Sequence, residues 1–314
     1  MIEVAQSLKG RDFTSIRPWA RAELELVLDL ADELKTRRAA GEPTDVLPRR
    51  TVGLVFQKPS TRTRVSFEAG VAELGGTALH LAAGDLQLGR GESIRDTAYV
   101  LSRYLDAIMI RTFAQADVDE LAEHASIPVV NGLTDTEHPC QALADLMTIR
   151  ERLGAIDGLR VAYVGDGNNV CVSLMDGCAR FGARFVAATP GDHQPPAAAV
   201  EEARAVAEAA GGSVDVVPAA TDAATGAHVL YTDVWTSMGQ EAERAARTHA
   251  LRDYAITPAL LELAAPEAIV MHCLPAHPGE EIAGDVLYGP RSAVWDQAEN
   301  RLHAQKALLA LIVP

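Results

Sequence analysis

The sequence predicts an α/β protein made of two similar doubly wound domains with parallel sheets, and three observations support this fold class. Short apolar runs alternate with amphipathic helical patterns along the whole chain. Most of these runs are apolar on both faces, which is typical of parallel strands covered by helices. The runs also form two groups, at about 51–130 and about 160–272, with a helical segment between them.

The period of the hydrophobic pattern gives the expected elements in order. Short continuous apolar runs predict strands at 51–56, 77–81, 106–110, 127–130, 160–165, 183–189, 213–217, 228–232 and 268–272. Apolar residues at helical spacing predict helices near 22–38, 64–75, 92–104, 115–125, 139–153, 170–181, 197–210 and 292–311.

The segment "HPCQALADLMTIRERLGAIDG" connects the two groups of strands and predicts a helix followed by a Gly-containing turn. We therefore expect a first domain at 1–138 and a second at 139–291, entered through a connecting helix at 139–153. The C-terminal helix, at about 292–314, is expected to pack back on the first domain. Ligands of such sheets bind at the carboxyl ends of the strands, so the active site is expected at the domain junction.

Composition and charge disfavour several classes of function. The 314 residues are 48% hydrophobic and 23% charged, as in an ordinary globular protein. The net charge of −15 disfavours nucleic acid as a partner. No run of about 18 apolar residues occurs, and the N-terminal segment shows no signal- or transit-peptide pattern. We therefore expect no membrane association and a cytoplasmic location.

The cysteines predict neither a disulfide framework nor a metal centre. They are few and form no C-x-x-C pair: Cys140, Cys171, Cys178 and Cys273. Their spacing relative to the nearby histidines matches no common zinc pattern. We expect no metal in this protein.

The stretch "FQKPSTRTRVSF" places polar residues where a strand meets a helix. Ser60 stands at the expected N-cap, and Phe67, Val71 and Leu74 then recur at the spacing of a buried helix face. The free N–H groups of about 61–63 would lie at the positive end of the helix dipole.

Two interpretations of this stretch remain open. Thr61 and Thr63 supply hydroxyl donors and Arg62 supplies a guanidinium fork, a set suited to a small, doubly charged anion. The same residues would also suit a capped helix start with exposed charges.

The motif "HPCQ" opens the connecting helix. Pro139 fits the first helical position, which places His138 at the N-cap and Gln141 one turn into the helix. Two neutral donors there could polarise a carbonyl group. The alternative is an N-capping histidine with an exposed glutamine.

The stretch "VGDGNNVCVSL" follows a strand and resembles a dinucleotide fingerprint. Val170 stands where the third glycine of G-x-G-x-x-G belongs, and no acidic residue follows at the expected distance. Asn168 and Asn169 could instead bind a polar small molecule.

Two further strands end in polar or reactive residues. In "YTDVWTSMGQE", Asp233 suits an ammonium group and Ser237 lies in a Gly-containing loop. In "MHCLPAHPGEE", Cys273 is either a buried apolar residue or a reactive thiol. Its pairing with His272 is geometrically poor, because adjacent residues of a strand point to opposite faces.

Taken in order, "STRTR", "HPCQ", "GDGNN", "DVWTSMG" and "HCLP" resemble the transcarbamoylase superfamily and, within it, the ornithine carbamoyltransferase family. The resemblance covers essentially the whole chain. "HPCQ", "SMG" and "HCLP" separate this family from aspartate carbamoyltransferases, which typically have a His-Pro-Leu-Pro motif and a lysine near the position of Gln87.

The resemblance implies a role for each motif. The phosphate of carbamoyl phosphate would be held by Ser60, Thr61, Arg62, Thr63 and Arg111. Its carbamoyl group would be bound by His138, Gln141, Arg301 and the backbone at Cys273 and Leu274. Ornithine would be bound by Asn169, Asp233, Ser237 and Met238, with Asn168 a less certain member. Gln87 would reach the site of a neighbouring subunit, which implies a homotrimer or a multiple of trimers with shared sites.

The first expected domain would thus bind carbamoyl phosphate and the second would bind ornithine. The reaction would transfer a carbamoyl group to the δ-amine of L-ornithine and give L-citrulline and phosphate, without a cofactor or a covalent enzyme intermediate. The catalytic residues would be Arg62, His138, Asp233 and Cys273. The amine pKa is about 10.4, as for lysine, so the site must favour the neutral amine.

Several alternatives remain. A sister transcarbamoylase acting on putrescine or acylated ornithine is the nearest, and "DVWTSMG" favours free ornithine over putrescine. An NAD(P)-dependent dehydrogenase and a non-catalytic binding module are more remote. The sequence does not distinguish arginine biosynthesis from arginine catabolism.

Overall fold

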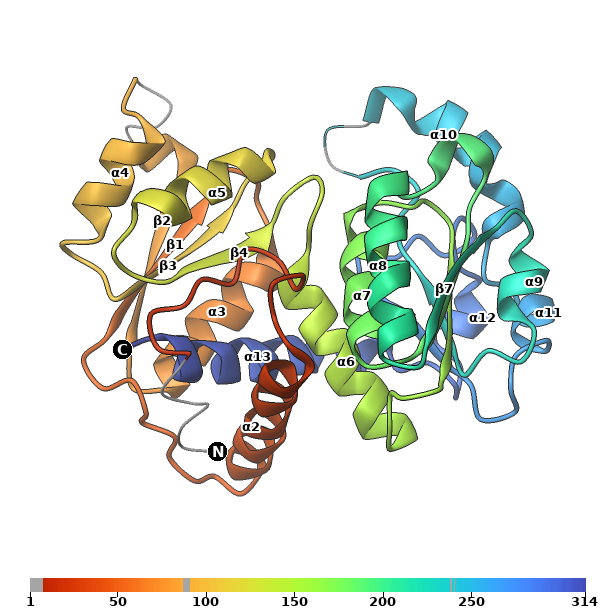
Figure 1. Ribbon diagram of the computed structural model, residues 1–314, viewed down its shortest axis with the longest axis horizontal. Coiled ribbons are helices and arrows are strands. Elements are labelled where there is room, and N and C mark those ends of the chain that lie inside the picture. The colour runs from red at the N-terminus through yellow and green to blue at the C-terminus, as the bar shows by residue number, and fades with distance from the viewer. Residues whose placement is uncertain (1–7, 87–90, 238, 240) are drawn as a thin grey trace. The chain divides into compact units, whose positions relative to one another are not determined.

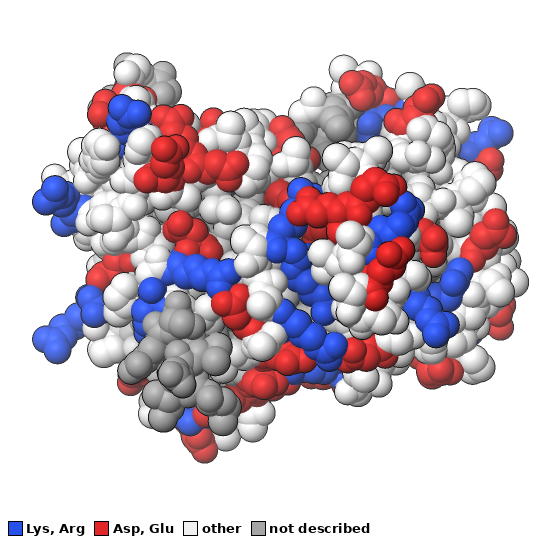
Figure 2. Space-filling view, in the orientation of Figure 1, with Lys and Arg blue, Asp and Glu red and all other residues white. Residues whose placement is uncertain are grey.

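The computed structural model describes residues 8–86, 91–237, 239 and 241–314 (Figure 1). No helix within this part of the chain is long and apolar enough to cross a membrane. On the face seen in Figure 2, acidic and basic side chains are interspersed. That face therefore offers no broad basic surface to a polyanion.

The chain divides into two compact units. Unit 1 comprises Met1–Met147 and Glu299–Pro314, and unit 2 comprises Thr148–Ala298. The domain boundaries expected from the sequence were different. They lay at the start of the connecting helix and at the start of the C-terminal helix. The units divide within α6 (Pro139–Leu153) and α13 (Val294–Ile312), so each of these helices supplies residues to both units.

Unit 1 contains a parallel sheet with the strand order β2-β1-β3-β4. The strands are β1 (Thr51–Phe56), β2 (Thr77–Ala82), β3 (Ala107–Arg111) and β4 (Val129–Leu133). The strand order reverses direction between β1 and β3. In such a sheet, ligands bind beyond the carboxyl ends of the strands at this point.

Helices cover both faces of the sheet of unit 1 (Figure 1). On one face, α4 (Ile94–Leu101) and α5 (Gln115–His124) contribute Ala98, Val118 and Leu121 to a buried apolar cluster. The other face carries α2 (Arg21–Ala39), α3 (Thr61–Glu73) and the end of α13.

The close approach of α3 to α13 depends on a glycine. A Cβ atom at Gly70 of α3 would lie 3.1 Å from the Lys306 side chain and 3.4 Å from that of Leu302, both on α13. A larger residue at this position would push the two helices apart, because both contacts are already tight.

Unit 2 contains a parallel sheet with the order β7-β6-β5-β8-β9. The strands are β5 (Arg160–Val164), β6 (Arg184–Ala188), β7 (Ser213–Val217), β8 (Val229–Thr232) and β9 (Ile269–His272). The order reverses between β5 and β8. The stretches "GDGNN" and "DVWTSMG" follow these two strands, so both begin at the position where this fold binds ligands.

The helices of unit 2 also lie on both faces of its sheet (Figure 1). They are α7 (Asn169–Arg180), α8 (Ala197–Ala209), α9 (Ala220–Ala224), α11 (Pro258–Leu261) and α12 (Gly284–Leu287). A further helix of this unit is α10 (Arg244–Leu251). One apolar cluster joins residues of β5, β6, β8 and β9 to α9, α11 and α12. The fold class predicted from the sequence, two α/β domains with parallel sheets, is confirmed.

The predicted strands and long helices agree with the observed ones to within a few residues. The sequence did not predict α9, α10, α11 or α12. Three of these helices have only four or five residues, which is too short for a helical period to be recognised. The fourth, "RAARTHAL", has too few apolar residues to show one.

Lys306 of α13 is a fully buried cation whose partner is Glu73 of α3. Lys306 Nζ lies 2.7 Å from Glu73 Oε2, and Arg38 Nε donates to Glu73 Oε1 at 2.9 Å. Burial acts to raise the pKa of Glu73, but the hydrogen bonds from Lys306 and Arg38 outweigh it and hold that pKa below its ordinary value. One carboxylate therefore ties α2, α3 and α13 together.

Replacing Glu73 by Gln is expected to lower the free energy of unfolding by roughly 2–3 kcal/mol, because the buried ammonium loses its charged partner. Urea denaturation followed by circular dichroism at neutral pH measures this change. Glu68→Gln on the same helix is the matched control, since Glu68 pairs with Arg64 on the surface.

Equal urea midpoints for the two variants would contradict this role of Glu73.

The stability that Glu73 contributes should also depend on pH. A carboxyl pKa that is lowered by folding contributes stability that is lost as pH falls through the folded-state pKa. The difference between the parent chain and Glu73→Gln should therefore shrink in acid.

Candidate active site

In unit 1, the turn from β1 into α3 is a capped helix start. Ser60 has extended backbone angles, and its Oγ accepts a hydrogen bond from the Thr63 N–H at 3.2 Å. This confirms Ser60 as the N-cap. Phe67, Val71 and Leu74 are fully buried, as their spacing predicted. The helix therefore begins at the carboxyl end of β1, with its positive end directed out of the sheet.

Arg301 approaches this turn from the C-terminal helix. Its guanidinium is buried, and Nη2 donates to Thr63 Oγ1 at 3.0 Å. Ser60 Oγ lies 3.2 Å from the same hydroxyl oxygen. The structure thus brings together Ser60, Thr63 and Arg301, although 238 positions separate Thr63 from Arg301 in the sequence.

Arg111 ends the neighbouring strand β3. It lies opposite Phe56 in the parallel register, and its carbonyl accepts a hydrogen bond from the Gln57 N–H at 2.9 Å. Its side chain is buried. The cations that follow β1 and end β3 therefore lie on the same edge of the sheet.

His138 lies within the field of these arginines. Burial and the positive charges of Arg301, Arg111 and Arg62 lower the pKa of His138 well below its ordinary value of 6.5. We call Arg62, Arg111 and Arg301 the arginine cluster. It concentrates positive charge locally in a chain whose net charge is −15.

The motif "HPCQ" begins α6 as predicted. Pro139 is the first helical residue, and the His138 carbonyl accepts hydrogen bonds from the N–H groups of Gln141 and Ala142 at 3.1 and 3.2 Å. The alternative of an exposed glutamine is wrong, because Gln141 is only 1% exposed. Its Nε2 donates to Asp145 at 2.8 Å, and its buried Oε1 accepts no hydrogen bond from the described residues.

In unit 2, Asn168 links the ends of β5 and β8. Its Oδ1 accepts hydrogen bonds from the N–H groups of Val170 and Cys171, at 3.0 and 3.2 Å, and so caps α7. Tyr163 donates to the same oxygen at 3.1 Å. The Asn168 Nδ2 donates to Asp233 Oδ2 at 2.8 Å. The amide is therefore held in one orientation by contacts on both of its sides.

These contacts disfavour the dinucleotide interpretation of "GDGNN". The N–H groups at the start of α7 are already bonded to Asn168, so they are not free to receive a pyrophosphate. The space beside Gly167 is also filled, since a Cβ atom there would lie 2.3 Å from the backbone nitrogen of Pro195. A pyrophosphate would have to approach through that space.

Asp233 joins the cysteine that follows β9. Cys273 Sγ donates to Asp233 Oδ1 at 2.8 Å, so the Asp233 carboxylate binds Asn168 with one oxygen and Cys273 with the other. Asp233 is 4% exposed, whereas Cys273 is half-buried. Asn168, Asp233 and Cys273 thus form one connected polar group at the carboxyl ends of β5, β8 and β9.

His272 does not activate this thiol. Its Nδ1 accepts a hydrogen bond from the Leu274 N–H at 2.9 Å, so the ring proton is on Nε2, which faces Glu281 at 3.2 Å. Both ring nitrogens are directed away from a role as base for Cys273. Leu274 has a φ of 60°, an uncommon value for a residue other than glycine.

Among the described residues, two groups bring ligand-type atoms within 4.8 Å of one another. They are Asp233 with His272 and Cys273, and His277 with Glu280 and Glu281. In the first group, the carboxylate, the thiol and both ring nitrogens have hydrogen-bond partners within the protein. The absence of a metal requirement stays a prediction.

The remaining predicted site residues differ in how exposed they are. Thr61 is exposed in the first turn of α3, and Asn169 is half-buried at the start of α7. Ser237 is half-buried in the loop after β8. Gln87 and Met238 lie outside the described residues.

Sequence reasoning from the residues missed Arg301 and Tyr163, and only the resemblance supplied Arg301. Both are buried, and a single sequence does not show which of its polar side chains the fold will bury.

Comparison with known proteins relates both halves of the chain to one family. Residues 11–151 match the profile described as "Aspartate/ornithine carbamoyltransferase, carbamoyl-P binding domain". Residues 157–312 match "Aspartate/ornithine carbamoyltransferase, Asp/Orn binding domain". The chain belongs to the aspartate/ornithine carbamoyltransferase family.

Relatives in this carbamoyltransferase family span the full chain. "Ornithine carbamoyltransferase" of Symbiobacterium thermophilum is 59% identical over 307 residues, covering 98% of this chain and 99% of the relative. "Ornithine carbamoyltransferase, anabolic" of Pyrococcus furiosus is 51% identical, with 98% of each chain covered. A solved structure of ornithine carbamoyltransferase from Pyrococcus furiosus superposes with a TM-score of 0.95 at 51% identity over 98% of both chains.

His138 is expected to stay neutral at pH 6, because burial and the arginine cluster lower its pKa. Nitrogen-15 NMR, assigned with a His138→Gln variant, should show no titration of its ring between pH 7.5 and 6. A titration midpoint near 6.5 would contradict the burial of the His138 ring beside the arginine cluster.

The same shift should make stability depend on pH. Because the unfolded chain binds the His138 proton more tightly than the folded chain does, the free energy of unfolding should fall as pH falls below about 6.5. His138→Gln should therefore lose less stability on acidification.

Proposed function

We propose that this chain transfers the carbamoyl group of carbamoyl phosphate to the δ-amine of L-ornithine, giving L-citrulline and phosphate. The observation that carries the proposal is the set of polar donors beyond the carboxyl ends of β1 and β3, where buried Arg301 donates to Thr63 beside the Ser60 cap and buried Arg111 ends the neighbouring strand. The family profile of carbamoyl phosphate binding matches this part of the chain. The names of the full-length relatives support ornithine as the second substrate.

In this proposal, unit 1 binds the phosphate dianion. The start of α3 offers backbone N–H groups, and Ser60, Thr61 and Thr63 offer hydroxyl groups to the phosphate oxygens. Arg62 and Arg111 supply the positive charge. Buried or half-buried guanidiniums attract a dianion more strongly than exposed ones, because less water screens them. This local attraction overcomes the repulsion of a chain with a net charge of −15.

The carbamoyl group is recognised by neutral and charged donors together. A neutral His138 can donate one N–H to the carbonyl oxygen without taking a proton from the solvent at neutral pH. Gln141 Oε1, buried and without a donor among the described residues, suits the carbamoyl NH₂ group. Arg301 and the backbone at Cys273 and Leu274 complete this part of the site. Negative charge grows on the carbonyl oxygen during attack, and these donors stabilise it.

Unit 2 binds ornithine in this proposal. Asp233 is a buried carboxylate held by Asn168 and Cys273, which suits an ammonium group of the amino acid. Asn169, Ser237 and Met238 are the further ornithine-binding residues. The δ-amine attacks directly as the neutral base, so orientation of the amine towards the carbonyl carbon carries much of the rate. No metal or organic cofactor takes part.

We also propose that the chain forms a homotrimer with shared sites. Large apolar side chains are exposed on β2, on α4 and just after it: Leu79 (43%), Tyr99 (53%), Val100 (45%) and Tyr104 (74%). Large exposed apolar side chains of this kind are available for contacts with a neighbouring subunit. The role of Gln87 in a neighbouring site, the cytoplasmic location and the expected domain limits stay predictions. The relative named anabolic supports arginine biosynthesis over catabolism.

The alternatives are less well supported. A putrescine enzyme has no use for residues that bind an α-amino group, and the full-length relatives are named for ornithine. A dehydrogenase needs a free pyrophosphate site after β5, where Asn168 and Pro195 already occupy the space.

A colorimetric citrulline assay with ornithine, putrescine, N-acetylornithine and aspartate tests the proposal. Among the four acceptors we expect turnover only with ornithine, and a preference for another acceptor would overturn the proposal.

Arg62→Ala is expected to abolish carbamoyl phosphate binding measured by calorimetry. Arg64→Gln is the matched control, because Arg64 pairs with Glu68 on the exposed face of the same helix. Near-normal affinity in Arg62→Ala would exclude its phosphate role.

Cys273→Ala is expected to raise the KM for ornithine and shift the pH profile of turnover, because Asp233 loses the thiol that donates to it. Turnover should persist, since the amine rather than the thiol is the nucleophile. Steady-state kinetics between pH 6 and 9 measure both effects. A carbamoylated Cys273 detected by mass spectrometry after rapid quenching would instead show covalent catalysis.

A further inference from the structure

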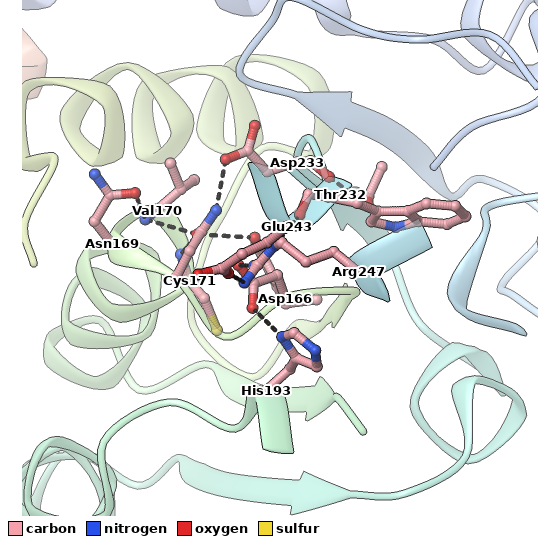
Figure 3. A network of polar contacts seen from close by, with 12 residues as sticks. Asp166, Asn169, Val170, Cys171, His193, Thr232, Asp233, Glu243 and Arg247 are labelled. Carbon is pink, nitrogen blue, oxygen red and sulfur yellow. Dashed lines mark hydrogen bonds and ion pairs between the residues drawn. The ribbon is translucent and has the colours of Figure 1, made fainter. Parts of the chain in front are cut away.

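Arg247 of α10 is a buried guanidinium outside the predicted site (Figure 3). Its Nη2 forms an ion pair with Asp166, and its Nε donates to the Trp235 carbonyl at 2.6 Å. Its Nη1 lies 3.7 Å from Glu243. Arg247 is 8% exposed, so the first two contacts are made largely out of water.

Two of the residues that Arg247 contacts, Asp166 and Trp235, lie in the segments that follow β5 and β8. The strand order of the sheet reverses between these two strands. Asp166 is in the stretch after β5, two residues before Asn168. Trp235 is in the loop after β8, two residues after Asp233 and two before Ser237. One planar guanidinium therefore joins two loops that are far apart in sequence. Each loop carries residues that the proposed function assigns to ornithine.

Asp166 is fixed on its other side as well. Its Oδ1 lies 3.1 Å from His193 Nδ1, and its carbonyl accepts a hydrogen bond from the Asn168 N–H at 2.7 Å. Burial raises the pKa of Asp166, while Arg247 and His193 act against that rise. The Asp166 backbone thus sets the position of Asn168, whose side chain in turn binds Asp233.

We propose that Arg247 is a positioning residue that sets the spacing between Asn168, Asp233 and Ser237 for the amino-acid substrate. The inference rests on the proposed function. Its physical basis is the fork of the guanidinium, which bonds a carboxylate and a carbonyl in two fixed directions at once. A lysine keeps the charge opposite Asp166 but lacks the second fixed direction. The loop after β8 would then lose its link to β5.

Arg247→Lys and Arg247→Gln test this role by steady-state kinetics with ornithine and by calorimetry with carbamoyl phosphate. We expect the KM for ornithine to rise roughly tenfold in Arg247→Lys and more in Arg247→Gln, because small displacements of binding groups are costly. The affinity for carbamoyl phosphate should be unchanged, since the residues assigned to the phosphate are in unit 1 and the contacts of Arg247 given above do not include the Cys273 and Leu274 backbone. Arg244→Gln is the matched control, because Arg244 is on the same helix and pairs with Glu280 at the surface.

A folded Arg247→Gln with an unchanged KM for ornithine would overturn the inference. Equal losses of ornithine binding and carbamoyl phosphate affinity would also overturn it, since they would indicate a general structural defect. If Arg247→Gln does not fold, Arg247→Lys decides the outcome by the same two measurements. Absence of citrulline formation by the parent chain would instead refute the proposed function, so the two failures are distinguishable.

Discussion

Parallel pairing of the strands is the constraint on which the rest of the structure depends. Because the strands of each sheet run in the same direction, the segments that follow them emerge at one edge. Ser60 follows β1, Arg111 ends β3, Asp233 follows β8 and Cys273 follows β9. Within each unit, residues separated by dozens of positions are thereby brought to one edge of the sheet without any sequence motif that contains them all.

The proposed binding residues of the two units differ in charge. In unit 1, burial and the arginine cluster lower the pKa of His138, which favours the neutral imidazole. In unit 2, a buried carboxylate at Asp233 is satisfied by an amide and a thiol, which are both neutral donors. A dianion suits the first arrangement and an ammonium the second. The two charges match the two substrates that the proposed reaction requires.

Buried ionic contacts also hold the helices in place around these sites. Glu73 joins the buried Lys306 to the exposed Arg38 in unit 1, while Asp166 pairs with the buried Arg247 in unit 2. Each pair is costly to desolvate, and removing one partner leaves a buried charge unpaired.

The sequence by itself determined the strands, the long helices and the Ser60 cap, because these depend on hydrophobic period and on local hydrogen bonding. It also predicted an anion site at Ser60 to Thr63, which supply the cap and the donors within one turn, and that role stays a proposal. Only the tertiary structure decided that Gln141 is buried, that Arg301 reaches Thr63 and that Arg247 joins Asp166 to Trp235. Those contacts join segments distant in the chain, and a hydrophobic pattern carries no information about which buried polar groups will meet.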